Sequence, residues 1–202
     1  MKHLVVSLAG IVLLVFLTSA PAADEKLKET PFYPLKVGTK WQYKVGAGSL
    51  TIKVTKHEQV GEVTCAVLEK SKDDQVLGSD HIGVTADGVY HYMIAGQKLD
   101  MPFRILKLPP KKGDNWKVEV KDRGKSVSGS FTLGEAEVVV PAGKYKAITA
   151  VSDGFQLPEA DGKTVKIDFK FWFVEKIGLV KHTIQIGDQK EVVIELEKFE
   201  GK

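Results

Sequence analysis

The stretch that decides the fold runs from Lys166 to Phe173 and reads KIDFKFWF. Its apolar members at every second position are Ile167, Phe169, Phe171 and Phe173. Between them stand Lys166, Asp168 and Lys170. A period of two residues sends alternate side chains to opposite faces of an extended backbone. The stretch therefore predicts a β-strand with one face in a core and the other face toward water.

The same alternation fills the chain on both sides of this stretch. Short segments of period two are separated by Gly, Asp or Pro, as in Trp41–Val45 and Leu50–Val54. No segment offers a convincing apolar stripe of helical period. We predict an all-β fold, a single antiparallel β-barrel or strongly curled sheet of about ten to twelve strands.

A weak internal repeat links the two halves of the chain. The segment from Pro34 to Trp41 matches the segment from Pro109 to Trp116 at an offset of 75 residues. We expect possible half-repeats over 32–108 and 109–202, closing on each other as one barrel because closure removes exposed strand edges. Chance similarity between β-hairpins is the alternative.

The N-terminus carries the three parts of a secretory signal peptide. Lys2 and His3 precede the apolar run Leu4–Leu17, which is too short for a membrane span of roughly 20 residues. Small residues follow, with Ala20 and Ala22 at the −3 and −1 positions of a cleavage site before Ala23.

These features divide the chain into three parts. We predict a cleaved signal peptide over 1–22, a charged lead-in over 23–31 and a single all-β domain over 32–202. The mature protein is expected in the periplasm or secreted, with no membrane span. It is not expected to be lipid-anchored, because no cysteine lies near the cleavage point.

Charge and cysteine content exclude several classes of partner and site. Lys and Arg number 29 against 26 Asp and Glu, a formal net charge of +3, and only Arg104 and Arg123 are arginines. A near-balanced, Arg-poor chain gives no reason to expect nucleic acid. Cys65 is the single cysteine, so no intrachain disulfide can form. Its strand pattern with Val63 and Val67 predicts a buried thiol rather than a nucleophile. We expect a monomer.

Catalytic and metal-binding motifs are missing from the sequence. It contains no H-E-x-x-H, C-x-x-C, G-x-S-x-G or glycine-rich phosphate loop. His81 and His91 flank a predicted Asp87-Gly88 turn and could approach across a hairpin near Asp80, but packed strand histidines are the preferred interpretation over a metal site. We predict no catalytic residue, no metal and no cofactor.

The densest aromatic cluster supplies the candidate binding residues, which are Phe169, Phe171, Trp172 and Phe173. Packing against an opposing sheet explains the three phenylalanines. Trp172 falls on the opposite face among Lys and Asp. An exposed Trp there would suit a ligand or partner surface.

Three motifs in order carry a resemblance that spans most of residues 32–199. They are Phe32–Tyr43, Val138–Ala147 and Phe171–Lys181. Together they resemble a broad group of exported bacterial β-rich proteins of unassigned function. The resemblance implies a half-open antiparallel barrel, distantly similar in shape to periplasmic lipoprotein carriers. It brings no catalytic residues to this chain.

Three classes of function remain open from the sequence. The leading hypothesis is an exported, non-catalytic binding or accessory domain that holds a small apolar ligand or engages an envelope protein. A ligand inside the barrel requires a cavity of roughly 300 Å³ or more. The alternatives are a hydrolase assembled from scattered Asp, Glu and His, which requires ionisable groups converging in one cleft, and a purely structural envelope role.

Overall fold

The structure is a computed structural model that describes residues 27–122, 125–158 and 163–202. The predicted signal peptide, its cleavage residues Ala20, Ala22 and Ala23, and residues 23–26 of the lead-in lie outside the described residues. The described part contains no helix long and apolar enough to cross a membrane.

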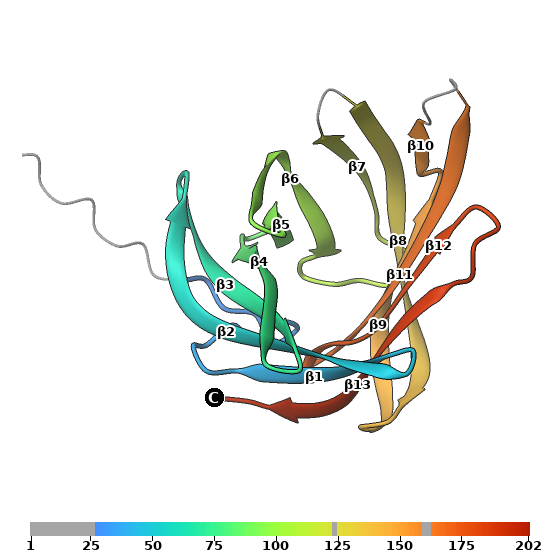
Figure 1. Ribbon diagram of the computed structural model, residues 1–202. Coiled ribbons are helices and arrows are strands. Elements are labelled where there is room, and N and C mark those ends of the chain that lie inside the picture. The colour runs from blue at the N-terminus through green and yellow to red at the C-terminus, as the bar shows by residue number, and fades with distance from the viewer. Residues whose placement is uncertain (1–26, 123–124, 159–162) are drawn as a thin grey trace, which may run out of the picture.

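The described residues form strands connected by turns (Figure 1). The strands of the first half are β1 (Lys40–Val45), β2 (Gly48–Val60), β3 (Val63–Lys72), β4 (Gln75–Val84), β5 (Gly88–Ile94) and β6 (Gln97–Lys107). Those of the second half are β7 (Asn115–Asp122), β8 (Lys125–Val140), β9 (Gly143–Asp153), β10 (Gln156–Pro158), β11 (Thr164–Val174), β12 (Gly178–Ile186) and β13 (Val192–Glu200).

All the pairings are antiparallel and join the strands into one curled sheet. Its order is β6-β5-β4-β3-β2-β1-β13-β12-β11-β9-β8-β7, with the short β10 paired to β11 off this path. The two halves, blue to green and yellow to red, face each other across the interior (Figure 1). The predicted all-β fold is therefore confirmed as a nearly closed antiparallel barrel.

The two end strands of the sheet, β6 and β7, meet through side chains. Among the described residues no backbone ladder joins them. Instead, Trp116 Nε1 donates to the carbonyl oxygen of Arg104 at 3.1 Å. The Lys107 ammonium lies 3.3 Å from the Asp114 carboxylate. The barrel is thus closed by backbone pairing everywhere except at this seam.

The turns that precede β1 and β7 have the same backbone hydrogen bonds. In the first, Gly38 N donates to Val54 O at 2.8 Å, and Val54 N donates to Thr39 O at 2.9 Å. The equivalent bonds of the second are Gly113 N to Leu133 O at 2.8 Å and Leu133 N to Asp114 O at 2.8 Å. This match falls on the motif repeated at an offset of 75 and favours an internal repeat. The boundaries of the two half-repeats stay a prediction.

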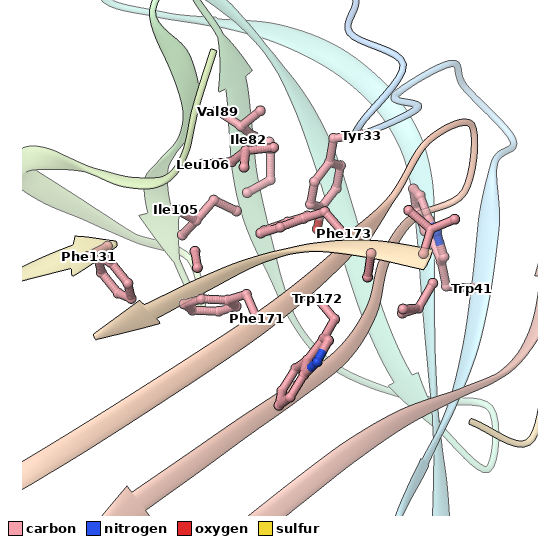
Figure 2. Packing of buried hydrophobic residues seen from close by; sticks show 14 of the residues in the cluster. Tyr33, Trp41, Ile82, Val89, Ile105, Leu106, Phe131, Phe171, Trp172 and Phe173 are labelled. Atoms are coloured by element: carbon pink, nitrogen blue, oxygen red, sulfur yellow. The ribbon is translucent and has the colours of Figure 1, made fainter. Parts of the chain in front are cut away.

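Tyr33, Trp41 and Phe173 pack together in the interior, and we call this cluster the aromatic plug (Figure 2). The Tyr33 ring lies 5.9 Å from that of Trp41 and 6.2 Å from that of Phe173, centroid to centroid. Trp41 Nε1 donates to Ile177 O at 2.7 Å, so burial leaves its polar atom satisfied. The residues around 27–39 therefore close the end at which β1 begins.

Cys65 is fully buried in β3, as its strand pattern predicted. Burial is the main cause that raises the pKa of its thiol to about 12, and the nearby Glu58 charge adds to it. A thiol that stays protonated at neutral pH is a poor nucleophile. Cys65 acts here as a small core hydrophobe.

We expect Gly113→Ala to destabilise the protein by about 1–2 kcal/mol, because Gly113 has a φ of +86° that L-residues disfavour. A Cβ at this position would meet nothing within 4 Å, so the backbone conformation is the only cause. Guanidinium denaturation of the variant measures the loss.

Gly48→Ala is the matched control for this variant. A Cβ there makes an ordinary contact with the Lys72 side chain at 3.5 Å, and the φ of Gly48 is not in the left-handed region. If both variants lose the same stability, the turn does not depend on the glycine conformation.

Candidate functional site

A cavity of about 350 Å³ lies inside the barrel between its two halves. Its aliphatic lining includes Leu50, Ile52, Leu68, Ile105, Leu179, Ile184 and Ile194. Its aromatic lining is Tyr33, Tyr43, Phe103, Phe169 and Phe171. The volume falls within the range of small-molecule sites, and such sites are mostly apolar with few polar groups.

The cavity extends from the Tyr33 ring, which is part of its lining, toward the end of the sheet opposite to the start of β1. Neighbouring antiparallel strands turn at alternate ends, so the turns at 46–47, 73–74, 95–96 and 187–191 share one end. Leu50, Lys70 and Ile184 lie in their strands close to these turns and line the cavity. Ile94 lines it as well and is 38% exposed, which marks the place where the cavity reaches solvent.

One wall of the cavity carries a satisfied ion pair. Lys70 Nζ lies 2.7 Å from Asp80 Oδ2. The other carboxylate oxygen, Asp80 Oδ1, accepts from Ala95 N at 2.9 Å. Both partners are largely buried, and the charge of Lys70 is balanced within the wall.

Two imidazoles complete the polar part of the lining, His91 from β5 and His182 from β12. His91 Nδ1 is 3.7 Å from Asp80 Oδ2, beyond hydrogen-bond distance. His182 stacks on Phe171, with ring centroids 4.3 Å apart. Among the described residues, the buried nitrogens His91 Nδ1 and His182 Nε2 have no hydrogen-bond partner.

Burial lowers the pKa of both histidines to about 4. For His91, the Asp80 charge opposes this effect and the Lys70 charge adds to it. For His182, the neighbouring His91 adds to it. Both rings are therefore neutral at pH 7, and each presents one N–H donor and one bare nitrogen acceptor.

The sheet register decides which histidines reach the interior. His91 pairs with Ile82 on one side and with Phe103 on the other, so it shares their inward face. A bulge in the β4–β5 ladder pairs His81 with Met93 instead. There His81 Nε2 lies 2.7 Å from Glu58 Oε1. His81 and His91 are therefore not cross-strand partners: Asp80 lies near His91, whereas His81 contacts a different carboxylate.

Neither His182 nor Lys70 was predicted from the sequence to belong to the site. A signal for His182 was present, because it stands two residues before the apolar Ile184 and shares its strand face. Lys70 stands two residues after the apolar Leu68 in β3. A polar residue at a strand position that should face the core is the pattern that could have predicted both residues.

The structure places the four aromatic candidates in different surroundings. Phe169 and Phe171 line the cavity. Phe173 is 0% exposed and belongs to the plugged end, next to Tyr33. The three phenylalanines pack across the interior, for example Phe169 on Phe103 of the opposite half at 6.5 Å.

The expectation of an exposed Trp172 is wrong, since its side chain is only 8% exposed. It does lie on the other face of β11 from Phe171, opposite Lys181. The Lys170 ammonium sits 4.6 Å and the Lys181 ammonium 5.6 Å from the Trp172 ring. In a central strand such long side chains cover a neighbouring ring and add cation–π attraction.

Comparisons with known proteins agree with the architecture. No family model and no curated protein matches the chain. A Bacteroides fragilis protein, inferred to be exported and described as having a YMCC-like fold, matches in structure with a TM-score of 0.50 at 13% identity. The match covers 84% of this chain and 98% of that one. This chain shares its fold.

A second solved structure with this fold comes from Parabacteroides distasonis, a protein inferred to be a lipoprotein. Its TM-score is 0.51 at 12% identity, again over 84% of this chain and 98% of that one. The resemblance to exported bacterial barrels drawn from the sequence motifs is thus confirmed at the level of the YMCC-like fold.

We expect the stability of the protein to fall as the pH is lowered from about 6.5 to about 4. In this window the unfolded chain protonates His182 and the folded chain does not, so unfolding takes up a proton. His182→Phe removes that uptake and should be more stable than wild type by a margin that grows by at most about 1.4 kcal/mol per pH unit. Urea denaturation at several pH values measures the margin. Parallel stability curves for the two proteins would contradict the assignment of a neutral buried His182.

Proposed function

We propose that this protein is an exported, non-catalytic binding protein that holds a small apolar ligand inside its barrel. The observation that carries the proposal is the cavity of about 350 Å³, lined mainly by aliphatic and aromatic side chains. A dry apolar cavity is unfavourable for stability, because its walls lose dispersion contacts that a ligand would restore.

The volume supports a ligand of modest size. At roughly 30 Å³ per atom, taken from the share of a water molecule in the liquid, the cavity of about 350 Å³ accepts about a dozen non-hydrogen atoms. Ile94 of β5 lines the cavity and is a partly exposed large hydrophobe. Apolar residues at an opening favour the entry of an apolar molecule.

A hydrolase is the second candidate, because Asp80, His91 and His182 lie together in one cavity. Two features weigh against it. No Ser, Thr or Cys is among the described lining residues, and an imidazole with a pKa of about 4 is a weak general base at neutral pH. Hydrolysis of 2-naphthyl acetate by the wild type, lost in His182→Phe, would favour the hydrolase.

Naphthalene should bind to the purified wild-type domain, and Ile184→Trp should reduce this binding to background. Ile184 lines the cavity, and an indole in its place would occupy the ligand volume. Equilibrium dialysis with fluorescence detection measures the bound fraction.

Val139→Trp is the matched control for the filled cavity. Val139 is 67% exposed in β8 and is not among the lining residues, so an indole there should leave binding unchanged. Circular dichroism verifies that both variants keep the fold. Undetectable binding of naphthalene to wild type, or equal binding to both variants, would contradict the proposed function.

Export is part of the proposal and depends on the predicted signal peptide. We expect the intact mass of protein recovered from the exported fraction to correspond to a chain that begins at Ala23. Ala22→Arg should block cleavage and leave the protein in the membrane fraction. A mass that includes residues 1–22, or an added lipid, would contradict a free exported protein.

A further inference from the structure

We propose that the ligand carries one uncharged polar group, such as a hydroxyl, that hydrogen-bonds to His182 while its apolar body lies against Phe103 and Phe169. This inference rests on the proposed binding function and names the chemical class of the ligand. It starts from the two imidazoles, which come from opposite halves of the barrel and line the same cavity.

The first argument concerns the hydrogen bonds of buried polar atoms. Buried polar atoms in folded proteins are paired in the great majority of cases, and an unpaired one costs about 1–3 kcal/mol. His91 Nδ1 and His182 Nε2 are buried nitrogens without a hydrogen-bond partner among the described residues. A phenylalanine would stack on Phe171 as His182 does, without this cost. Because these two nitrogens have almost no accessible surface, a ligand in the cavity would meet each ring at its other nitrogen, His91 Nε2 or His182 Nδ1.

The second argument concerns how the aromatic and imidazole rings of the cavity lie relative to one another. The His91 ring lies 6.4 Å from the Phe103 ring, and the Phe103 ring lies 6.5 Å from that of Phe169. Phe169 in turn lies 6.4 Å from His182. The two polar groups thus flank an aromatic surface that joins the two halves. A molecule lying on Phe103 and Phe169 has an imidazole beside it on either side.

Charge gives the third argument and selects an uncharged group over an anion. Among the described lining residues Lys70 and Asp80 are the only charged ones, and they neutralise each other at 2.7 Å. An anionic head group would have to be buried without a free counter-charge, which is strongly unfavourable. A hydroxyl both donates and accepts, so it suits either tautomer of each neutral imidazole.

The experiment compares three probes that share one apolar body: naphthalene, 2-naphthylmethanol and 2-naphthoate. With wild-type protein at pH 7, we expect 2-naphthylmethanol to bind roughly fivefold more tightly than naphthalene, the gain of one net hydrogen bond. Naphthoate should bind more weakly than both. Isothermal titration calorimetry measures the three affinities.

His182→Phe should abolish the advantage of 2-naphthylmethanol over naphthalene while naphthalene itself still binds. His57→Gln is the control, because His57 bonds to Leu35 O at 2.8 Å and does not line the cavity. It should keep the wild-type order of affinities. In the wild type, the ring-nitrogen NMR shifts of His182 should also move when 2-naphthylmethanol is added, a readout that requires no variant.

Two results would overturn the inference while leaving the proposed function in place. In the first, naphthalene binds as tightly as the alcohol and the ring-nitrogen shifts of His182 stay unchanged, as they would if ordered water satisfies the imidazoles. In the second, naphthoate binds most tightly, which would assign the site to anions. If none of the three probes binds, the proposed function itself fails.

Discussion

The pairing of β1 with β13 is the interaction on which the rest of the structure depends. Each half of the chain is a meander with one apolar face, and an open sheet leaves such a face in water. The antiparallel ladder that sets Trp41 opposite Phe199 joins the two halves into one sheet with a common interior. Because Trp41 also bonds to Ile177 O, the same residue anchors both the ladder and the plug. The opposite seam, between β6 and β7, is joined by contacts such as those of Trp116 and Lys107.

The interior is built differently at its two ends. Trp41 and Phe173 pack against the Tyr33 ring, and Trp41 Nε1 donates to Ile177 O. Around His91 and His182 the space is not filled, and His91 Nδ1 and His182 Nε2 are buried without a hydrogen-bond partner among the described residues. A functional site is expected where the side chains are not those that would pack best.

The alternation of apolar and polar residues predicted much of the fold, and its failures have a common cause. Alternation in Lys166–Phe173 predicted a strand, and alternation around Cys65 predicted a buried thiol; both agree with the structure. The same rule correctly sent Trp172 to the outer face but wrongly implied exposure, because Lys170 and Lys181 cover the ring. Lys181 is a neighbour across the sheet, and strand alternation carries no information on which side chains cover a face.

The sequence by itself determined the all-β class, the inward and outward faces of the strands and the equivalent turns before Trp41 and Trp116. These features depend on period-two patterning and on glycines at positive φ, both of which are local. Only the tertiary structure decided that His91 and His182 share one cavity and that Lys70 neutralises Asp80. Those residues lie on different strands, and their distances depend on sheet register, bulges and closure. The cavity forms where the inward faces of several strands meet, so the sequence of one strand does not predict it.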